Sequence, residues 1–116
     1  MGLKIAFIGA GSIGFTRILL SDLLTVPEFR DAEISFTDIN EDNLRMVTEL
    51  CQRDIIENGL SIKIHATKNR CEAFKDAKYV ICCVRIGMLE AFKTDVEIPL
   101  KYGVDQIGRA SCRERV

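Results

Sequence analysis

Two periodicities of apolar residues follow one another along the chain and predict strands that alternate with helices. Residues 3–8 and 79–84 are short, nearly continuous apolar runs, which are typical of strands buried on both faces. Residues 32–38 and 61–66 alternate apolar and polar side chains, which predicts strands with one less buried face. Because a helical pattern follows each of the first three strands, the chain predicts a parallel sheet of the α/β class.

Helical spacing of apolar residues marks the two longer segments between these strands. The first predicted helix spans residues 12–26 and ends before Pro27, and its apolar residues are Phe15, Ile18, Leu19, Leu23 and Val26. The second spans residues 41–58, starts with two acidic residues, and is followed by Gly59 at a left-handed position. Its apolar stripe consists of Leu44, Val47, Cys51 and Ile55.

The remaining helices are shorter or less clearly bounded. Asn69 and Glu72 resemble the capping box of a short third helix. Residues 88–102 begin with a helical pattern that Pro99 limits. The two continuously apolar strands, first and fourth, fit the centre of a doubly wound sheet, and the alternating ones fit its edge. The predicted strand order is therefore 3-2-1-4.

A glycine-rich segment at residues 9–14 (GAGSIG) links the first predicted strand to the first predicted helix. The spacing GxGxxG in a strand–turn–helix context is typical of dinucleotide-binding turns. Gly9 permits the tight turn, Gly11 admits a pyrophosphate close to the backbone, and Gly14 allows the helix to pack closely on the strand. The phosphates would bind to amide N–H groups at the helix start, which are those of Ser12, Ile13 and Gly14.

Asp38 stands at the end of the second predicted strand. A carboxylate there accepts hydrogen bonds from both ribose hydroxyls of the adenosine and repels a 2′-phosphate, which favours NAD over NADP. Val84 and Arg85 follow the fourth strand at the edge where open α/β sheets bind ligands, so both are candidate cofactor contacts. For Arg85, a salt bridge at the rim is the alternative. Residues 1–106 are therefore predicted to form the amino-terminal half of a Rossmann-type NAD(P)-binding fold, truncated after the fourth strand.

Composition and charge exclude several classes of protein. With 47% hydrophobic and 28% charged residues the chain has the composition of a folded domain, and a net charge of -1 favours neither nucleic acid nor membrane surfaces. The sequence contains neither an apolar run of about 18 residues nor a secretory signal, so we expect a cytoplasmic protein.

The five cysteines of the chain lack metal-ligand spacing, and Cys82 and Cys83 are expected in the core. The single histidine, His65, is expected in solvent.

Three segments of the chain resemble the amino-terminal part of glycoside hydrolase family 4: GAGSIGFTRILLSDLL, TDIN and VRIGMLEAFKTDVEIPLKYGVDQ. The resemblance spans residues 4–106 and is most specific in residues 85–106. This family comprises NAD- and divalent-metal-dependent α-galactosidases, α-glucosidases and 6-phospho-glycosidases. The resemblance implies a cycle in which NAD takes hydride from sugar C3 and a metal, usually Mn²⁺, stabilises the enolate formed at C2. Elimination of the glycosidic bond, addition of water and return of the hydride complete it.

The resemblance also implies what this chain does not contain. The metal-binding cysteine and histidine and the catalytic base of the family lie beyond the matched segment. No catalytic or metal-binding residue is therefore assigned, and the chain alone is expected to lack glycosidase activity. The longer protein is expected to act on a small-molecule glycoside and to form a homo-oligomer.

Two departures from the family pattern are informative. Phe92 occupies a position where the phospho-glycosidases carry an arginine, which favours a neutral or uronic-acid α-glycoside over a phosphorylated one. Residues 107–116 (IGRASCRERV) replace a glycine-rich family segment and resemble a translated sequencing adapter. This decapeptide is interpreted as a non-native tail.

Two other functions remain open on the sequence. An NAD-dependent dehydrogenase of the malate or lactate type explains the glycine segment and Asp38 equally well, whereas residues 85–106 favour the glycosidase. A non-catalytic nucleotide-binding module is the third candidate. We also expect marginal folding, because a chain that ends after the fourth strand leaves an apolar sheet edge without a partner.

Overall fold

The computed structural model describes residues 3–84 and 86–105. The chain divides into two units, residues 1–84 and 85–116, and each is described by itself. The elements in chain order are β1 (Lys4–Ile8), α1 (Ile13–Leu24), the short 3-10 helix η1 (Pro27–Phe29), β2 (Glu33–Thr37), α2 (Glu41–Glu57), β3 (Ile64–Ala66), α3 (Arg70–Phe74), β4 (Tyr79–Cys82) and α4 (Met88–Leu100).

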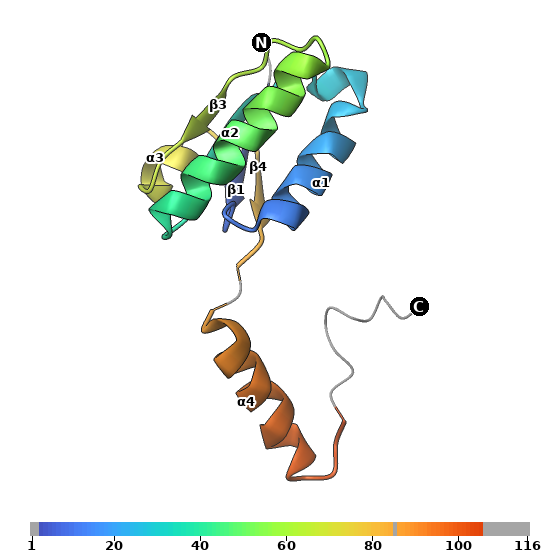
Figure 1. The fold of residues 1–116 in the computed structure, drawn as a ribbon, viewed down its shortest axis with the longest axis vertical. Coiled ribbons are helices and arrows are strands. Elements are labelled where there is room, and N and C mark those ends of the chain that lie inside the picture. Colours follow the sequence, from blue (N-terminus) through green and yellow to red (C-terminus); the bar gives the residue numbers. More distant parts are fainter. Residues whose placement is uncertain (1–2, 85, 106–116) are drawn as a thin grey trace. The chain divides into compact units, whose positions relative to one another are not determined.

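All strand pairs in the first unit are parallel, and the sheet order is β3-β2-β1-β4. This confirms the predicted order 3-2-1-4. Helices α1 and α2 contact each other and lie side by side across the sheet (Figure 1). Because the strands are parallel, the turns after β1 and β2 emerge at the same edge of the sheet. The glycine-rich segment and Asp38 therefore meet there.

The core of the first unit lies between β1, β2 and α2. The rings of Phe7 and Phe36 occupy facing register positions and pack edge to face, with centroids 5.3 Å apart. The predicted apolar stripe of α2 is confirmed, since Leu44, Val47, Cys51 and Ile55 are all buried. The predicted signals at both ends of α2 are confirmed, since its first turn contains two acidic residues and Gly59 after its end has a φ of +75°. The structure adds a cap, because the Asn40 side chain accepts a hydrogen bond from the Asn43 amide.

The predicted apolar face of the first helix is only partly confirmed. Leu19 and Leu23 pack against the core as predicted, whereas Phe15 and Ile18 are more than half exposed. The buried residues of α1 are Thr16 and Leu20. The cause is local, because the Thr16 hydroxyl donates to the carbonyl oxygen of Ala10 in the preceding turn. This bond directs the Thr16 side of the helix inward, and Ile18, about half a turn away, faces solvent.

The predicted burial of β2 and β4 is also wrong. In β2 the polar side chains Ser35 and Thr37 are buried together with the apolar ones, because β2 lies between β1 and β3 and contacts both α2 and α3. In β4 no residue is fully buried, and Tyr79 and Val80 are about half exposed. Within the described sheet β4 is the edge strand and pairs with β1 alone.

The exposure of β4 also corrects the expectation for its cysteines. Cys82 is exposed and Cys83 is partly exposed, so neither belongs to the core.

At the other edge of the sheet, Ile62 and Ile64 are buried as their alternation predicts. The start of α3 confirms half of the predicted capping box, since the Asn69 side chain accepts hydrogen bonds from the amides of Cys71 and Glu72. The Asn69 amide donates to the Thr67 hydroxyl instead of to Glu72.

The second unit contains α4, which the sequence pattern anticipates. Pro99 lies in its last turn, where its carbonyl oxygen still accepts from the amides of Tyr102 and Val104. No residue of α4 is buried, and Met88 and Leu89 are largely exposed.

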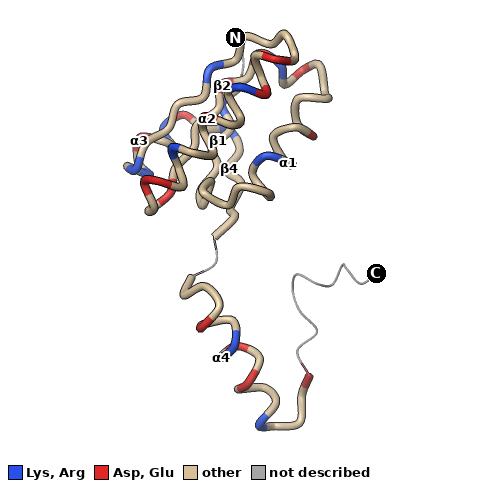
Figure 2. The backbone as a smooth tube through the Cα atoms, in the orientation of Figure 1, with Lys and Arg blue, Asp and Glu red and all other residues tan. Residues whose placement is uncertain are grey.

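In the part of the chain that the structure describes, none of the helices combines the length and the apolarity that crossing a membrane requires. Acidic and basic residues are interspersed along this part, as Figure 2 shows for α4.

Candidate functional site

The turn after β1 requires glycine at its first position. Gly9 has a φ of +83°, a conformation that side chains rarely adopt. A Cβ atom there would lie 2.6 Å from the carbonyl oxygen of Cys83 and 3.0 Å from Cγ1 of Val84. The end of β4 thus packs directly against the turn. Gly9 serves the tight turn that the sequence predicts for it.

The backbone of this glycine turn is tied to the end of β2. The amides of Gly9 and Ala10 both donate to the carbonyl oxygen of Thr37, at 3.0 and 3.1 Å. The Ser12 amide donates back to Gly9, at 3.2 Å, which closes the turn. The conformation of the turn is therefore tied to its neighbour strand.

Gly11 and Asp38 form the centre of the site. The Gly11 amide donates to Oδ2 of Asp38 at 2.8 Å, and the Asn40 amide donates to Oδ1 at 2.8 Å. A Cβ atom at Gly11 would lie 2.8 Å from Oδ2 of Asp38 and 3.0 Å from Cβ of Asn43, so no side chain fits. Each carboxylate oxygen of Asp38 retains a further acceptor position, because an oxygen of this kind can accept two hydrogen bonds.

The start of α1 presents amide groups beside Gly11. Ser12 is the N-cap residue, but its side chain makes no capping hydrogen bond. The first turn of a helix leaves its amides without intrahelical acceptors, and Ile13 and Gly14 are exposed. The Ser12 amide, which the sequence also assigns to phosphate binding, already donates to the carbonyl oxygen of Gly9. Together with the positive end of the helix dipole, the amides of Ile13 and Gly14 favour an anion.

The role predicted for Gly14 is wrong. A Cβ atom at Gly14 would meet nothing within 4 Å, so close packing of the helix on the strand does not require glycine there. The close approach is made instead by Thr16 and Ala10, both fully buried. Gly14 lies on the outer side of the first turn, among the exposed amides.

Of the other residues singled out in the sequence, the structure describes Val84, Phe92 and His65 but not Arg85. Val84 lies beside the glycine turn and is 45% exposed, whereas Arg85 lies outside the described residues. Phe92 is on α4, in the second unit. His65 is exposed, as predicted, with Nε2 4.0 Å from Oε2 of Glu72.

Sequence reasoning missed two residues next to the site. Ile39 directly follows Asp38, and its side chain is 95% exposed. Asn43, in the first turn of α2, lies against Gly11. The sequence does carry a signal for Ile39. It is an aliphatic residue between Asp38 and Asn40, at a turn where polar side chains are usually preferred.

Comparison with known proteins then places the chain in a family. Residues 4–112 match the family described as Family 4 glycosyl hydrolase. The chain belongs to this family. It is 51% identical over 110 residues to an alpha-galactosidase of Rhizobium meliloti (strain 1021), covering 94% of this chain and 22% of that protein. The family 4 chain therefore spans less than a quarter of the length of this relative.

Solved structures agree with the family assignment. The 6-phospho-beta glucosidase from Thermotoga maritima, in a structure with NAD and glucose-6-phosphate, matches with a TM-score of 0.75 and 33% identity. The match covers 90% of this chain and 25% of that one. A second structure of the same enzyme contains manganese as well. A malate dehydrogenase from Cryptosporidium parvum has a TM-score of 0.59 at 22% identity, which shows the fold alone.

The cysteines of the family 4 chain do not take part in any group of His, Cys, Asp or Glu side chains that could hold a metal ion among the described residues. Burial raises the pKa of the Cys51 thiol to about 11, from an ordinary value of 9.0. Burial also raises the pKa of Cys83. Both thiols are therefore protonated and poorly nucleophilic near neutral pH.

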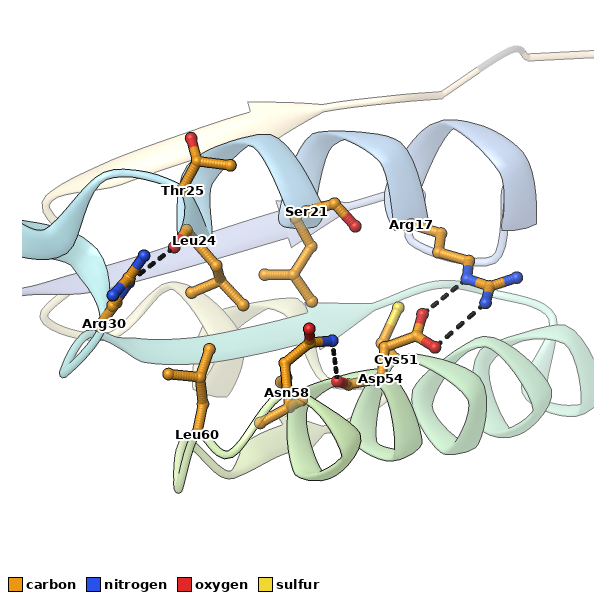
Figure 3. A pocket seen from close by; sticks show the side chains of 11 residues that line it. Arg17, Ser21, Leu24, Thr25, Arg30, Cys51, Asp54, Asn58 and Leu60 are labelled. Atoms are coloured by element: carbon orange, nitrogen blue, oxygen red, sulfur yellow. Dashed lines mark hydrogen bonds and ion pairs between the residues drawn. The ribbon is translucent and has the colours of Figure 1, made fainter.

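A separate cavity of about 380 Å³ is lined by residues of α1 and α2 and by residues that follow α1, η1 and α2 (Figure 3). At its mouth the Arg17 guanidinium binds the Asp54 carboxylate through two hydrogen bonds, of 2.6 and 3.1 Å. This pairing raises the pKa of Arg17. None of the residues that line the cavity belongs to the glycine turn or to the β2–α2 turn, so it is not part of the candidate site.

Proposed function

We propose that residues 3–84 bind the adenosine diphosphate half of NAD where the glycine turn meets the β2–α2 turn. The observation that carries this proposal is the 2.8 Å hydrogen bond between the Gly11 amide and Asp38. It holds a carboxylate beside a backbone without a side chain and next to exposed helix amides, which is the geometry a nucleotide diphosphate requires. The family 4 enzyme of Thermotoga maritima has been solved with NAD, which supports the choice of dinucleotide.

Each part of this site has a separate task in binding. The amides of Ile13 and Gly14 would hold the pyrophosphate, the Ser12 amide would keep the turn closed through Gly9, and Asp38 would accept hydrogen bonds from the ribose hydroxyls. Ile39 would lie under the adenine, which is attached to the same ribose, and cover its apolar face. Val84 would border the same dinucleotide. Arg85 is proposed as a contact on sequence grounds alone.

For the longer protein we propose NAD- and divalent-metal-dependent hydrolysis of α-glycosides. When bound, NAD supplies a hydride acceptor and Mn²⁺ a Lewis acid for a redox-assisted elimination and addition. The residues of this chain would bind and orient the dinucleotide, whereas the metal ligands and the base would come from beyond the matched segment. The chain alone is therefore proposed to be inactive, and the longer protein to be a cytoplasmic homo-oligomer. Its 51% identical relative is an alpha-galactosidase, which supports an α-glycoside substrate.

The family match favours the glycosidase over the malate or lactate dehydrogenase. The dehydrogenase alternative rests on the glycine turn and the acidic residue after β2, and both features serve any NAD-binding Rossmann-type domain.

Calorimetry on this chain tests the proposed cofactor. We expect NAD and ADP-ribose to bind with one-to-one stoichiometry and NADP to bind at least about tenfold more weakly, because Asp38 repels its 2′-phosphate. Asp38→Ala should weaken NAD binding roughly tenfold or more, since a carboxylate is an unusually strong acceptor, and should narrow the gap to NADP.

The matched control for this experiment is Asp31→Ala, which changes an exposed aspartate before β2 and should leave both affinities unchanged. A folded chain that produces no heat with NAD would overturn the proposal. A folded chain that binds NADP as tightly as NAD would overturn the role of Asp38.

A further inference from the structure

The peptide group between Ala10 and Gly11 is held on both of its polar sides. Its carbonyl oxygen accepts a hydrogen bond from the Thr16 hydroxyl at 3.0 Å, and its N–H donates to Asp38 at 2.8 Å. In a trans peptide the C=O and N–H groups point in opposite directions, and the described chain contains no cis peptide. The two bonds together therefore fix the plane of this peptide.

The Thr16 hydroxyl is diverted from the acceptor that a helical threonine ordinarily uses. Such a hydroxyl usually bonds to the carbonyl three or four residues earlier in its own helix, as Thr48 does to Leu44 at 2.7 Å. The corresponding carbonyl for Thr16 belongs to Ser12, which accepts from the Thr16 amide. The hydroxyl instead reaches six residues back, outside the helix, to Ala10.

We propose that Thr16 is a positioning residue for the dinucleotide and that its hydroxyl presets the Ala10–Gly11 peptide before the cofactor arrives. This inference rests on the proposed function and adds to it a residue that would not touch the ligand. Thr16 and Ala10 are both fully buried, so the bond is shielded from water. Through the Gly11 amide, the hydroxyl also fixes the oxygen of Asp38 that faces the turn.

Removal of the hydroxyl has a defined consequence. The buried carbonyl of Ala10 would lose its partner, and an unsatisfied buried carbonyl is costly. Since Gly11 tolerates many backbone conformations, the peptide plane would then rotate to recover a partner. Its amide would leave Asp38, and the dinucleotide would have to reorder the turn on binding, which lowers affinity.

Three variants separate positioning from simple packing. Thr16→Val keeps the shape and removes the hydroxyl, Thr16→Ser keeps the hydroxyl, and Thr48→Val removes a comparable hydroxyl from α2. The test is to measure the ADP-ribose affinity of each variant by calorimetry, at a temperature where circular dichroism shows every variant to be folded. Thr16→Val should bind roughly three- to tenfold more weakly, which corresponds to one lost hydrogen bond. Thr16→Ser should stay within about twofold of the unsubstituted chain, and Thr48→Val should bind as that chain does.

A second readout needs no ligand. The Gly11 amide should exchange its hydrogen faster in Thr16→Val than in Thr16→Ser, as followed by nuclear magnetic resonance. Unchanged affinity and unchanged Gly11 exchange in a folded Thr16→Val would overturn the proposal. An equal loss of affinity in Thr48→Val would also overturn it, because the effect would then be general destabilisation.

Two further results have equally clear meanings. If Thr16→Val does not fold, the comparison of Thr16→Ala with Thr16→Ser takes its place, because these two again differ in the hydroxyl. If no variant binds ADP-ribose, including the unsubstituted chain, the proposed function fails, whereas Gly11 exchange still decides whether Thr16 holds the peptide.

Discussion

Strands β2 and β4 flank β1 on opposite sides, and their burial is the reverse of what their sequences suggest. In β2, which contains glutamate, serine and threonine, every residue except Glu33 is buried. In β4, which reads Tyr-Val-Ile-Cys, none is fully buried. The difference arises from position in the sheet, because β2 is covered by helices and neighbour strands and β4 is an edge. The burial of a strand therefore depends on what covers it as well as on its composition.

The comparison also explains how β2 tolerates polar residues. Ser35 is fully buried, and its hydroxyl oxygen has no hydrogen-bond partner in the described structure. Thr37 is buried at the end of the strand, where its carbonyl oxygen holds the glycine turn. In β2, then, the buried end of a partly polar strand supports the site. The alpha-galactosidase relative is more than four times as long as this chain, and we propose that further residues of the longer protein cover β4.

The largest expected effect is on stability, from two aromatic substitutions that contrast these strands. Phe36→Ala in β2 should destabilise the chain by about 3–5 kcal/mol, because it opens a cavity against Phe7. Tyr79→Ala in β4 should cost less than about 1 kcal/mol, because the side chain is already half exposed. Urea unfolding followed by circular dichroism measures both, and equal losses would contradict the assignment of burial.

An alkaline transition should follow from the buried thiol on α2. The pKa of Cys51 is raised by burial to about 11 in the folded chain, against 9.0 for an ordinary thiol. The unfolded chain therefore releases this proton at lower pH than the folded chain does. Stability should fall between pH 9.0 and about 11, by on the order of 2 kcal/mol. Thermal melts in this range measure the fall, and Cys51→Ala should reduce their pH dependence.

The exposed edge should make the chain self-associate. An unpaired apolar strand is a template for pairing with another chain, so sedimentation velocity should show larger species at higher concentration. Val80→Lys in β4 should shift the chain toward the monomer, whereas Ile56→Lys, on the exposed side of α2, should not. A chain that sediments as a monomer at every concentration would contradict this account of β4.

The smallest expected effect concerns the buried serine of β2. Ser35→Ala should leave stability unchanged or raise it by up to about 1 kcal/mol, because it removes an unpartnered buried hydroxyl. The same urea titration measures it. A clear loss of stability would mean that the hydroxyl has a partner.

The sequence predicts the helix pattern and the stripe of α2, because these depend on local periodicity. The strand order is also predicted correctly, but the burial expected of β2 and β4, which supported it, is wrong. The sequence misplaces part of the buried face of α1. Leu19 and Leu23 pack against the core as predicted, but Phe15 and Ile18 are exposed, because a hydrogen bond from Thr16 orients the helix. Such a bond, six residues apart, leaves no periodic signal. Gly11 and Asp38 follow from motif spacing, whereas Ile39 carries only a weak local signal and its exposure identifies it.

The central claim is that the glycine turn and the β2–α2 turn form one dinucleotide site. Titration of the isotope-labelled chain with NAD, followed by nuclear magnetic resonance, tests it most directly. The account predicts saturable shifts at the Gly11 amide and the Ile39 methyl groups, with little change at Asn58 in the separate cavity. Shifts that centre on the cavity, or no shifts at Gly11 while NAD binds, would contradict it.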